Sequence, residues 1–172
     1  MGDISFERPF VSPHHTSSSV SIVGGTSKAK PGQVSIAHNG ILFMDEFLEF
    51  NRSVLETLRQ PMEDKEVSIA RADRAVKYPA SFMLVAACNP CPCGYYGDSK
   101  RECVCTPSQV QKYRARLSGP LLDRIDIHME VKSVDLKEIA GLEDGEDSAS
   151  IRERVKTAHA VQKARFKDDK IF

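Results

Sequence analysis

The 172 residues are enough for one domain with a hydrophobic core of its own and a short appendage, which excludes a fold that needs disulfides or metal as its main support. Twenty-four basic and 24 acidic residues give a formal net charge of zero, so the overall charge excludes a general attraction to nucleic acid or membranes. The sequence has neither an apolar run of the roughly 20 residues that span a bilayer nor a signal peptide, so we expect a soluble, cytoplasmic protein.

The first 40 residues are rich in Ser, Gly, Pro and His, which predicts mostly loop. Apolar alternation over 20–23 predicts one short strand in this region. Pro31 favours the start of a short helix, and Asn39 with Gly40 favours its end, because glycine readily adopts the left-handed conformation that closes helices.

Ile41–Met44 is an apolar run that predicts a strand buried on both faces, and Asp45 and Glu46 follow it directly. Sheets of α/β proteins bind their ligands at the carboxyl ends of the strands. A nucleotide hydrolase uses two acids at such a place, one to hold magnesium through water and one to polarise the attacking water. Two acids after an apolar strand also occur without a function, so this pattern alone leaves both interpretations open.

A helix and a hairpin are predicted next. The helix is capped by Asn51 and ended by Pro61, and three of its apolar side chains share one face. Apolar alternation over 67–69 and again over 76–78, with a turn between, predicts two antiparallel strands. The hairpin carries basic residues near its tip, namely Arg71, Arg74 and Lys77.

A second apolar run, 81–87, predicts another strand buried on both faces, and Pro90 prevents further strand pairing after Asn89. The loop that follows holds two Cys-x-Cys pairs. Four thiolates suit one tetrahedral zinc, although Cys-x-x-Cys is the more usual spacing. Zinc and reduced thiols without metal both stay open, for Cys91, Cys93, Cys103 and Cys105.

The remaining chain predicts two helices and a strand. A Thr-Pro-Ser-Gln start predicts a helix over 106–117, and apolar alternation over 125–131 predicts a strand with one polar face near a sheet edge. After the acidic linker 143–147, Ser150 begins a predicted capping box for a helix that reaches the chain end.

Several segments, each weak alone, together resemble one family. They are Arg8-Pro9-Phe10, Ser12-Pro13-His14-His15-Thr16, Pro31-Gly32-Gln33-Val34, Ala37-His38-Asn39-Gly40, Asp45-Glu46, Asn89-Pro90-Cys91-Pro92-Cys93-Gly94 and Leu117-Ser118-Gly119-Pro120-Leu121-Leu122-Asp123-Arg124. Over nearly its whole length the chain resembles the magnesium-chelatase-like AAA+ ATPases, and most closely the competence protein ComM (YifB) family.

The resemblance implies an α/β fold with two parts. Residues 1–134 would form a partial AAA+ P-loop NTPase core, a parallel sheet with flanking helices, a β-hairpin before sensor 1 and the cysteine loop 88–105. Residues 135–172 would form a linker and the first helix of a C-terminal helical lid that is cut short.

The resemblance also implies the roles of four residues and the cofactors ATP and magnesium. Asp45 and Glu46 would form the Walker B motif, with Asp45 holding magnesium through water. Asn89 would be sensor 1, and Arg124 would be the arginine finger that reaches a neighbouring subunit's nucleotide. The resemblance therefore also implies that the chain's partners are further copies of itself, in a hexameric ring.

The ComM family is associated with branch migration of DNA during natural transformation, so the resemblance favours DNA as a partner. Relatives point the hairpin before sensor 1 into the central pore, where Arg71, Arg74 and Lys77 would meet DNA phosphates. A solvated hairpin is the alternative. The roles of His14 and His15 stay open, because adjacent side chains in an extended segment point apart and do not share a metal.

One departure from the family is that the sequence contains no phosphate-binding loop of the type G-x-x-x-x-G-K-[ST]. We therefore expect the chain to be part of a longer ATPase, with further lid helices after Phe172, and to hydrolyse little or no ATP by itself.

Two other functions stay open. The ATPase subunit of magnesium chelatase would use a similar ring, although the cysteine loop and the Pro-His-His segment favour the ComM family. A non-catalytic, zinc-stabilised module that binds nucleic acid would account for the cysteines and the basic hairpin. It would leave Asp45, Glu46, Asn89 and Arg124 unexplained.

Overall fold

The computed structural model describes residues 7–25, 29–70, 75–131 and 145–166. The chain divides into two compact units, Met1–Val131 and Lys132–Phe172, and each is described by itself.

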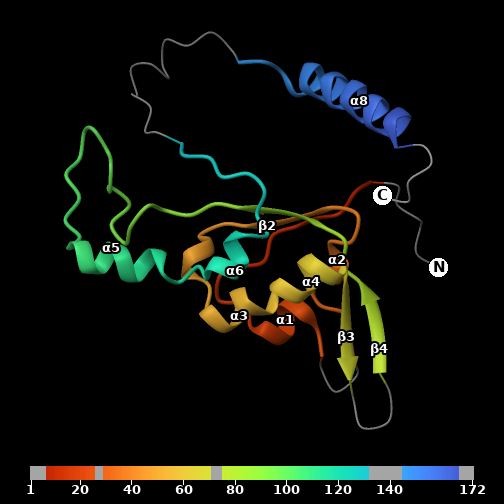
Figure 1. The fold of residues 1–172 in the computed structure, drawn as a ribbon, viewed down its shortest axis with the longest axis horizontal. Helices are drawn as coiled ribbons and strands as arrows, with labels where there is room; N and C mark the ends of the chain where they lie inside the picture. Colours follow the sequence, from red (N-terminus) through yellow and green to blue (C-terminus); the bar gives the residue numbers. More distant parts are fainter. Residues whose placement is uncertain (1–6, 26–28, 71–74, 132–144, 167–172) are drawn as a thin grey trace. The chain divides into compact units, whose positions relative to one another are not determined.

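Three parallel strands form the sheet of the first unit. They are β1 (Phe10–Val11), β2 (Ile41–Met44) and β5 (Met83–Ala86), in the order β1-β2-β5. Ile41 lies opposite both Phe10 and Met83, so the three strands start at one level. With helices flanking this sheet (Figure 1), the predicted α/β fold class is confirmed.

The short strand predicted over 20–23 is wrong. These residues belong to the helix α1 (Ser19–Val23), while the short strand of this region is β1, ten residues earlier in the chain. Ser18 decides the matter, because its hydroxyl accepts the backbone N–H of Ser21 at 3.2 Å and so satisfies a donor that the first helical turn leaves free. The helix places Ile22 in the core with no exposed surface.

The short helix predicted after Pro31 is confirmed as α2 (Gln33–Ile36). Asn39, which follows it, has the left-handed conformation, with φ of 60°. Gly40 then allows β2 to approach β1. A Cβ at this position would lie 2.0 Å from the carbonyl oxygen of Pro9, the same oxygen that accepts the N–H of Ile41 at 2.8 Å.

The chain from β2 to the hairpin is helical, through η1 (Phe47–Glu49), α3 (Arg52–Thr57) and α4 (Arg59–Asp64). The predicted cap is confirmed, since the Asn51 side chain accepts the N–H of Ser53 at 3.0 Å. The prediction that Pro61 ends the helical segment is wrong. Pro61 lies in the first turn of α4, where the absence of its N–H costs little because those donors have no partner within the helix.

The core lies on one face of the sheet. Leu42 and Met44 of β2 point into it and are fully buried. The other core side chains come partly from helices α1, α2, α3 and a later helix, α6 (Gly119–Leu122), and partly from residues outside these helices. The fully buried core side chains contributed from outside the sheet include Ile22, Val34, Leu55, Leu58 and Leu121.

The other face of the sheet carries apolar side chains that the described residues leave uncovered. Met83 is 62% exposed, Val85 40% and Phe10 65%, although Phe10 stacks on Phe43 with ring centroids 6.0 Å apart. The prediction that β2 and the strand over 81–87 are buried on both faces is therefore wrong for this second face. Side chains alternate between the two faces of a strand, and the described helices pack on only one of them.

The predicted hairpin is confirmed as β3 (Glu66–Ala70) paired with antiparallel β4 (Ala75–Pro79) (Figure 1). Val67 and Ile69 are buried, and the hydroxyl of Tyr78 donates to the carbonyl oxygen of Ala29 at 2.6 Å, which attaches the hairpin to the body. The tip, residues 71–74, lies outside the described residues.

The predicted capped helix is confirmed as α5 (Pro107–Arg114), three residues shorter than predicted. Thr106 accepts the N–H of Gln109 at 3.3 Å, and Gln109 accepts the N–H of Thr106 at 2.8 Å. A short helix that the sequence did not predict, α6 (Gly119–Leu122), follows.

The strand predicted over 125–131 is wrong. A strand requires a neighbouring backbone to pair with, and the described part of the chain supplies none beside this segment. Three of its apolar side chains are therefore exposed, namely Ile127, Met129 and Val131.

The second unit contains the helix α8 (Ser148–Arg165), which confirms a helix in this segment. It ends at Arg165, with Phe166 as its C-cap, and does not reach the chain end as predicted. Its cap is Asp147 and not Ser150, since the Asp147 carboxylate accepts the N–H groups of Ala149 and Ser150 at 2.7 and 2.9 Å. An aspartate this close to the first turn also interacts favourably with the positive end of the helix dipole. None of the helices in the described ranges is long and apolar enough to cross a membrane.

We expect Leu42→Ala to lower the free energy of unfolding by about 2–5 kcal/mol, because it leaves a cavity under the central strand. Met83→Ala, on the exposed face of the neighbouring strand, should change it by about 0.5 kcal/mol or less. Urea denaturation of the chain measures both. Ile22→Val, with an expected loss of about 0.5–1.5 kcal/mol, serves if Leu42→Ala does not fold. Equal losses at Leu42 and Met83 would contradict a one-sided core.

Candidate functional site

The carboxyl ends of β2 and β5 lie side by side. The N–H of Ala87 donates to the carbonyl oxygen of Met44 at 3.0 Å, and the N–H of Phe47 donates to the carbonyl oxygen of Ala87 at 2.8 Å. Asp45 and Glu46 lie between these two hydrogen bonds, and Asn89 follows Ala87 by two residues. The structure thus brings the three residues predicted from the two strand ends to one edge of the sheet.

Glu46 has an uncommon backbone conformation, left-handed with φ of 51° and ψ of 43°. For a residue with a Cβ this conformation costs on the order of 1 kcal/mol or more. The N–H of Glu46 donates to the Asp45 carboxylate at 2.8 Å, which helps to hold the turn. The turn places two carboxylates, both on exposed residues, at the end of a buried strand.

His15 contacts the Glu46 carboxylate directly, with 2.7 Å between its Nδ1 and Oε2. Its ring packs on His14, with centroids 4.2 Å apart, and meets Phe50 edge-on at 6.4 Å. The sequence left the role of His15 open. The sequence did not predict β1 and so gave no sign that His15 follows a strand of the sheet, as Glu46 follows β2. In the structure three strands deliver polar side chains to this edge.

Arg116 also lies beside this segment. Its guanidinium donates to the carbonyl oxygen of Leu48 and lies 3.4 Å from the Glu49 carboxylate. An open, polar hollow of about 760 Å³ runs along these residues. It is lined by His15, Thr16, Ser17, Ser18, Ser19, Glu49, Phe50, Asn51, Arg52, Ser53, Val54 and Arg116. Arg116 follows α5, so its contact with the turn after Glu46 joins segments that are far apart in the sequence.

Arg124, the fourth predicted site residue, has different neighbours. It follows α6, donates to the carbonyl oxygen of Pro120 at 2.6 Å and forms an ion pair with Glu63 of α4. Its charged partner is thus an acid of α4 and not an acid of the strand ends. In this chain the structure does not bring Arg124 into contact with Asp45, Glu46 or Asn89 within the described residues.

The four predicted cysteines form one cluster, and their sulfur atoms all lie within 4.8 Å of one another. Cys91 Sγ is 3.4 Å from Cys93 Sγ and 3.7 Å from Cys103 Sγ, so none of these contacts is a disulfide. A backbone hydrogen bond from Tyr95 lowers the pKa of the Cys93 thiol to about 6. Cys88 is not part of this cluster.

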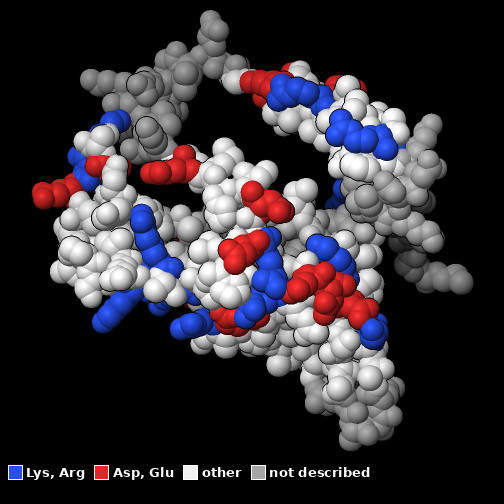
Figure 2. Space-filling model, viewed as in Figure 1, with Lys and Arg blue, Asp and Glu red and all other residues white. Residues whose placement is uncertain are grey.

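The predicted DNA-binding residues are only partly visible. Arg71 and Arg74 lie outside the described residues. Lys77 is paired with Glu66, with 2.5 Å between Nζ and Oε1, and this pairing raises the pKa of Lys77. Figure 2 shows acidic and basic side chains intermixed on the face in view.

Comparison with known proteins gives a family match over residues 2–139, to "Magnesium chelatase, subunit ChlI". The chain is 44% identical over 160 residues to the competence protein ComM of Haemophilus influenzae, covering 92% of this chain and 31% of that protein. It is 45% identical over 164 residues to YifB of Salmonella typhimurium, covering 94% of this chain and 32% of that protein.

A more distant match is the probable DNA helicase MCM9 of Arabidopsis thaliana, 29% identical over 104 residues, which are 60% of this chain and 14% of that protein. The chain spans about a third of the length of the ComM and YifB proteins that it matches. Because the family match covers most of its residues and these relatives align with more than nine-tenths of it, the chain belongs to the magnesium chelatase subunit ChlI family, in the group that includes ComM and YifB.

Proposed function

We propose that this chain supplies the magnesium-holding and water-polarising part of an ATP-hydrolysing site, in a cytoplasmic AAA+ ATPase that remodels DNA. The observation that carries the proposal is the meeting of two parallel strand ends, which puts Asp45, Glu46 and Asn89 on one edge of the sheet. Ligands of α/β sheets bind at this edge.

The donor set fits magnesium, which prefers oxygen ligands and keeps several waters. One Asp45 oxygen accepts the N–H of Glu46, which leaves the other oxygen for a metal-bound water. Magnesium, when bound, offsets the negative charge of the phosphates. Glu46 polarises the attacking water, and the Asn89 amide orients it. The triphosphate itself is held by residues outside these 172, since the sequence has no phosphate-binding loop.

His15 acts as a positioning residue for Glu46. A carboxylate on an exposed turn has several rotamers available, and a charge-assisted hydrogen bond from the imidazole selects one of them. Because the rings of Phe50 and His14 pack against the His15 imidazole, the imidazole is fixed in the orientation that contacts Glu46.

Arg124 is proposed to reach the nucleotide of a neighbouring subunit, as an arginine finger in a ring. In the single chain its guanidinium pairs with Glu63, and the side chain retains 26% of its exposure. Assembly would then exchange the Glu63 carboxylate for a phosphate, to which a guanidinium can donate two parallel hydrogen bonds. The ring couples turnover in one subunit to its neighbour.

DNA is proposed as the partner on two grounds. The names of the relatives include a competence protein and a probable DNA helicase. In sequence, Arg71 and Arg74 also lie between the paired strands β3 and β4, and two guanidinium groups there would meet phosphates.

We expect ATP hydrolysis by the longer protein that contains this segment to increase with branched DNA. Glu46→Gln should lower turnover by roughly 100-fold or more, because an amide does not accept a proton, and Arg124→Ala should do the same. Glu153→Gln on α8 is the control and should have no effect. Steady-state assays with and without DNA measure this. Turnover that does not respond to DNA would favour a chelatase-type motor. If the 172-residue chain alone hydrolysed ATP and Glu46→Gln abolished this activity, the claim that residues outside the chain hold the triphosphate would be wrong.

His15→Ala should lower kcat of the longer protein by about tenfold and leave the KM for ATP nearly unchanged, because one charge-assisted hydrogen bond is lost near the reacting water. His15→Asn retains a donor and should restore most of the rate. His159→Ala, at an exposed histidine of α8, is the control and should leave kcat unchanged. A kcat for His15→Ala equal to that of the unchanged protein would exclude the positioning role.

Charge reversal of Arg71 and Arg74 in the assembled protein should weaken DNA binding and reduce the dependence of log K on log salt by about 2, one for each lost phosphate contact. Lys77→Gln should have a smaller effect, because Lys77 is already paired with Glu66. Fluorescence anisotropy with labelled DNA over a range of salt concentrations measures both. Unchanged affinity after charge reversal would remove the hairpin from the DNA-binding surface.

A further inference from the structure

The loop between β5 and α5, residues 88–105, has almost no hydrophobic core. Cys91 is the one buried side chain among these described residues. Gly94 and Gly97 turn the chain with φ of 85°, a conformation that glycine adopts readily, and no atom lies within 4 Å of the place where their side chains would begin. Apolar burial therefore contributes little to holding this loop in one conformation.

The four sulfur atoms have the spacing of a metal site. A tetrahedral zinc with Zn–S bonds of about 2.3 Å separates its sulfurs by roughly 3.8 Å. In the cluster, Cys91 Sγ lies 3.4 Å from Cys93 Sγ and 3.7 Å from Cys103 Sγ, and Cys93 Sγ lies 3.6 Å from Cys103 Sγ. Cys105 completes the set within 4.8 Å of the others. A disulfide would require about 2.05 Å.

We propose that Cys91, Cys93, Cys103 and Cys105 bind one structural zinc ion, which clamps the end of β5 to the start of α5. Four thiolates in a closed tetrahedral set favour zinc over magnesium or calcium, which require oxygen ligands. All four positions are taken by protein sulfur, so the ion holds no water and has a structural role. The proposal goes beyond the ATP-hydrolysing function and does not depend on it.

The ligands sit at the two ends of the loop, and this position gives the metal its effect. Cys91 follows Asn89 by two residues, and Cys105 directly precedes Thr106, the cap of α5. One ion therefore fixes the distance between the sensor-like amide and a helix that lies far along the chain. Without the ion, no interaction of similar strength offsets the conformational entropy that this loop loses when it is ordered.

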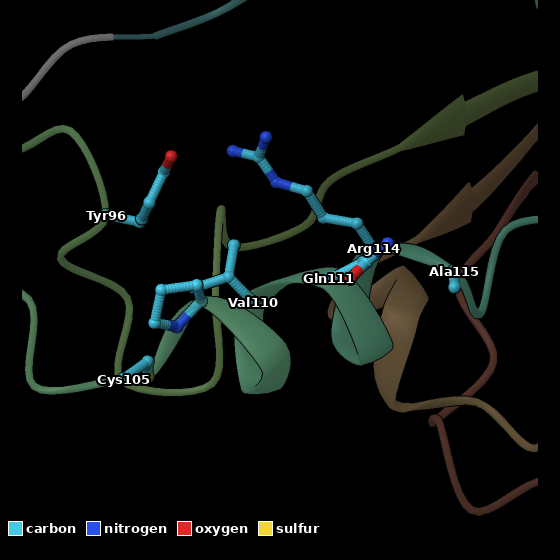
Figure 3. Close-up of a pocket in the computed structure, with 7 residues that line it drawn as sticks. Tyr96, Cys105, Val110, Gln111, Arg114 and Ala115 are labelled. Atoms are coloured by element: carbon cyan, nitrogen blue, oxygen red, sulfur yellow. The ribbon is translucent and has the colours of Figure 1, made fainter.

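Contacts between the loop and α5 agree with such a clamp. The Arg114 Nε donates to the carbonyl oxygen of Pro90 at 3.1 Å, and the guanidinium lies 4.8 Å from the centre of the Tyr96 ring. Figure 3 shows Tyr96 and Arg114 extending toward each other across a pocket of about 520 Å³, with Cys105 at the start of the helix. These contacts hold the backbone next to Asn89 against α5. The zinc ion therefore affects Asn89 only by fixing where this residue lies.

The first test is the metal content of the chain, purified without added chelator after expression with zinc. We expect one zinc per chain, and Cys103→Ser should lose most of it. Cys88→Ser is the matched control and should keep it, since Cys88 lies outside the cluster. A chain that contains no zinc, or iron in its place, would overturn the proposal, as would full zinc content in Cys103→Ser.

A second test needs no substitution and so does not depend on the folding of a variant. In the native chain a thiol reagent should modify Cys88 rapidly and the other four cysteines slowly, and a strong chelator should make all five reactive. Replacement of zinc by Co²⁺ should give the intense visible absorption of a tetrahedral thiolate site. Rapid modification of all five thiols before chelation would contradict a bound metal. Neither test involves ATP, so either can fail while the proposed ATPase function stands.

Discussion

The parallel pairing of β2 with β5 is the constraint on which the rest of the site depends. Two backbone hydrogen bonds, from Ala87 to Met44 and from Phe47 to Ala87, carry the pairing past the last residues of both strands. They fix the turn at Glu46 against the start of the segment that leads to Asn89. Because the strands are parallel and in register, both chains leave the sheet at one edge, and every polar residue placed after a strand arrives there.

The core supports this edge from one side. Leu42 and Met44 point from β2 into the core, so the strand that precedes the two acids also has the most buried side chains of the three-stranded sheet. The opposite face, with Phe10 and Met83, is apolar and exposed among the described residues. In α/β proteins both faces of a parallel sheet are normally covered. The chain spans about a third of its ComM and YifB relatives, which leaves ample sequence in such proteins to cover this face.

The two sides of the site are held by different physical means. On the β2 side, packing of Phe47 and Phe50 in the core fixes the turn, and His15 reaches Glu46 from the segment that follows the neighbouring strand β1. On the β5 side, the chain leaves the sheet into a loop with a single buried side chain, and the sulfur cluster takes the place of a core. The strand ends are therefore held by the hydrophobic core on one side and by the proposed metal cluster on the other.

Local patterns in the sequence determined most of the elements. The apolar run before Asp45, the caps Asn51 and Thr106, and the alternation in the hairpin each act within a few residues, so they predicted β2, α3, α5 and the β3–β4 pair. The four cysteines were predicted as one possible metal set for the same reason, since two close pairs in one loop have few ways to lie apart.

Tertiary structure decided what no local pattern contains. The alternation over 125–131 is that of a strand, yet Ile127 and Met129 are exposed because pairing requires a second backbone at the right place. Likewise the partner of Glu46 is His15, 31 positions earlier, and the partner of Arg124 is Glu63, 61 positions earlier. Hydrogen bonds and ion pairs act over a few ångströms in space, so which residues they join depends on how distant segments pack.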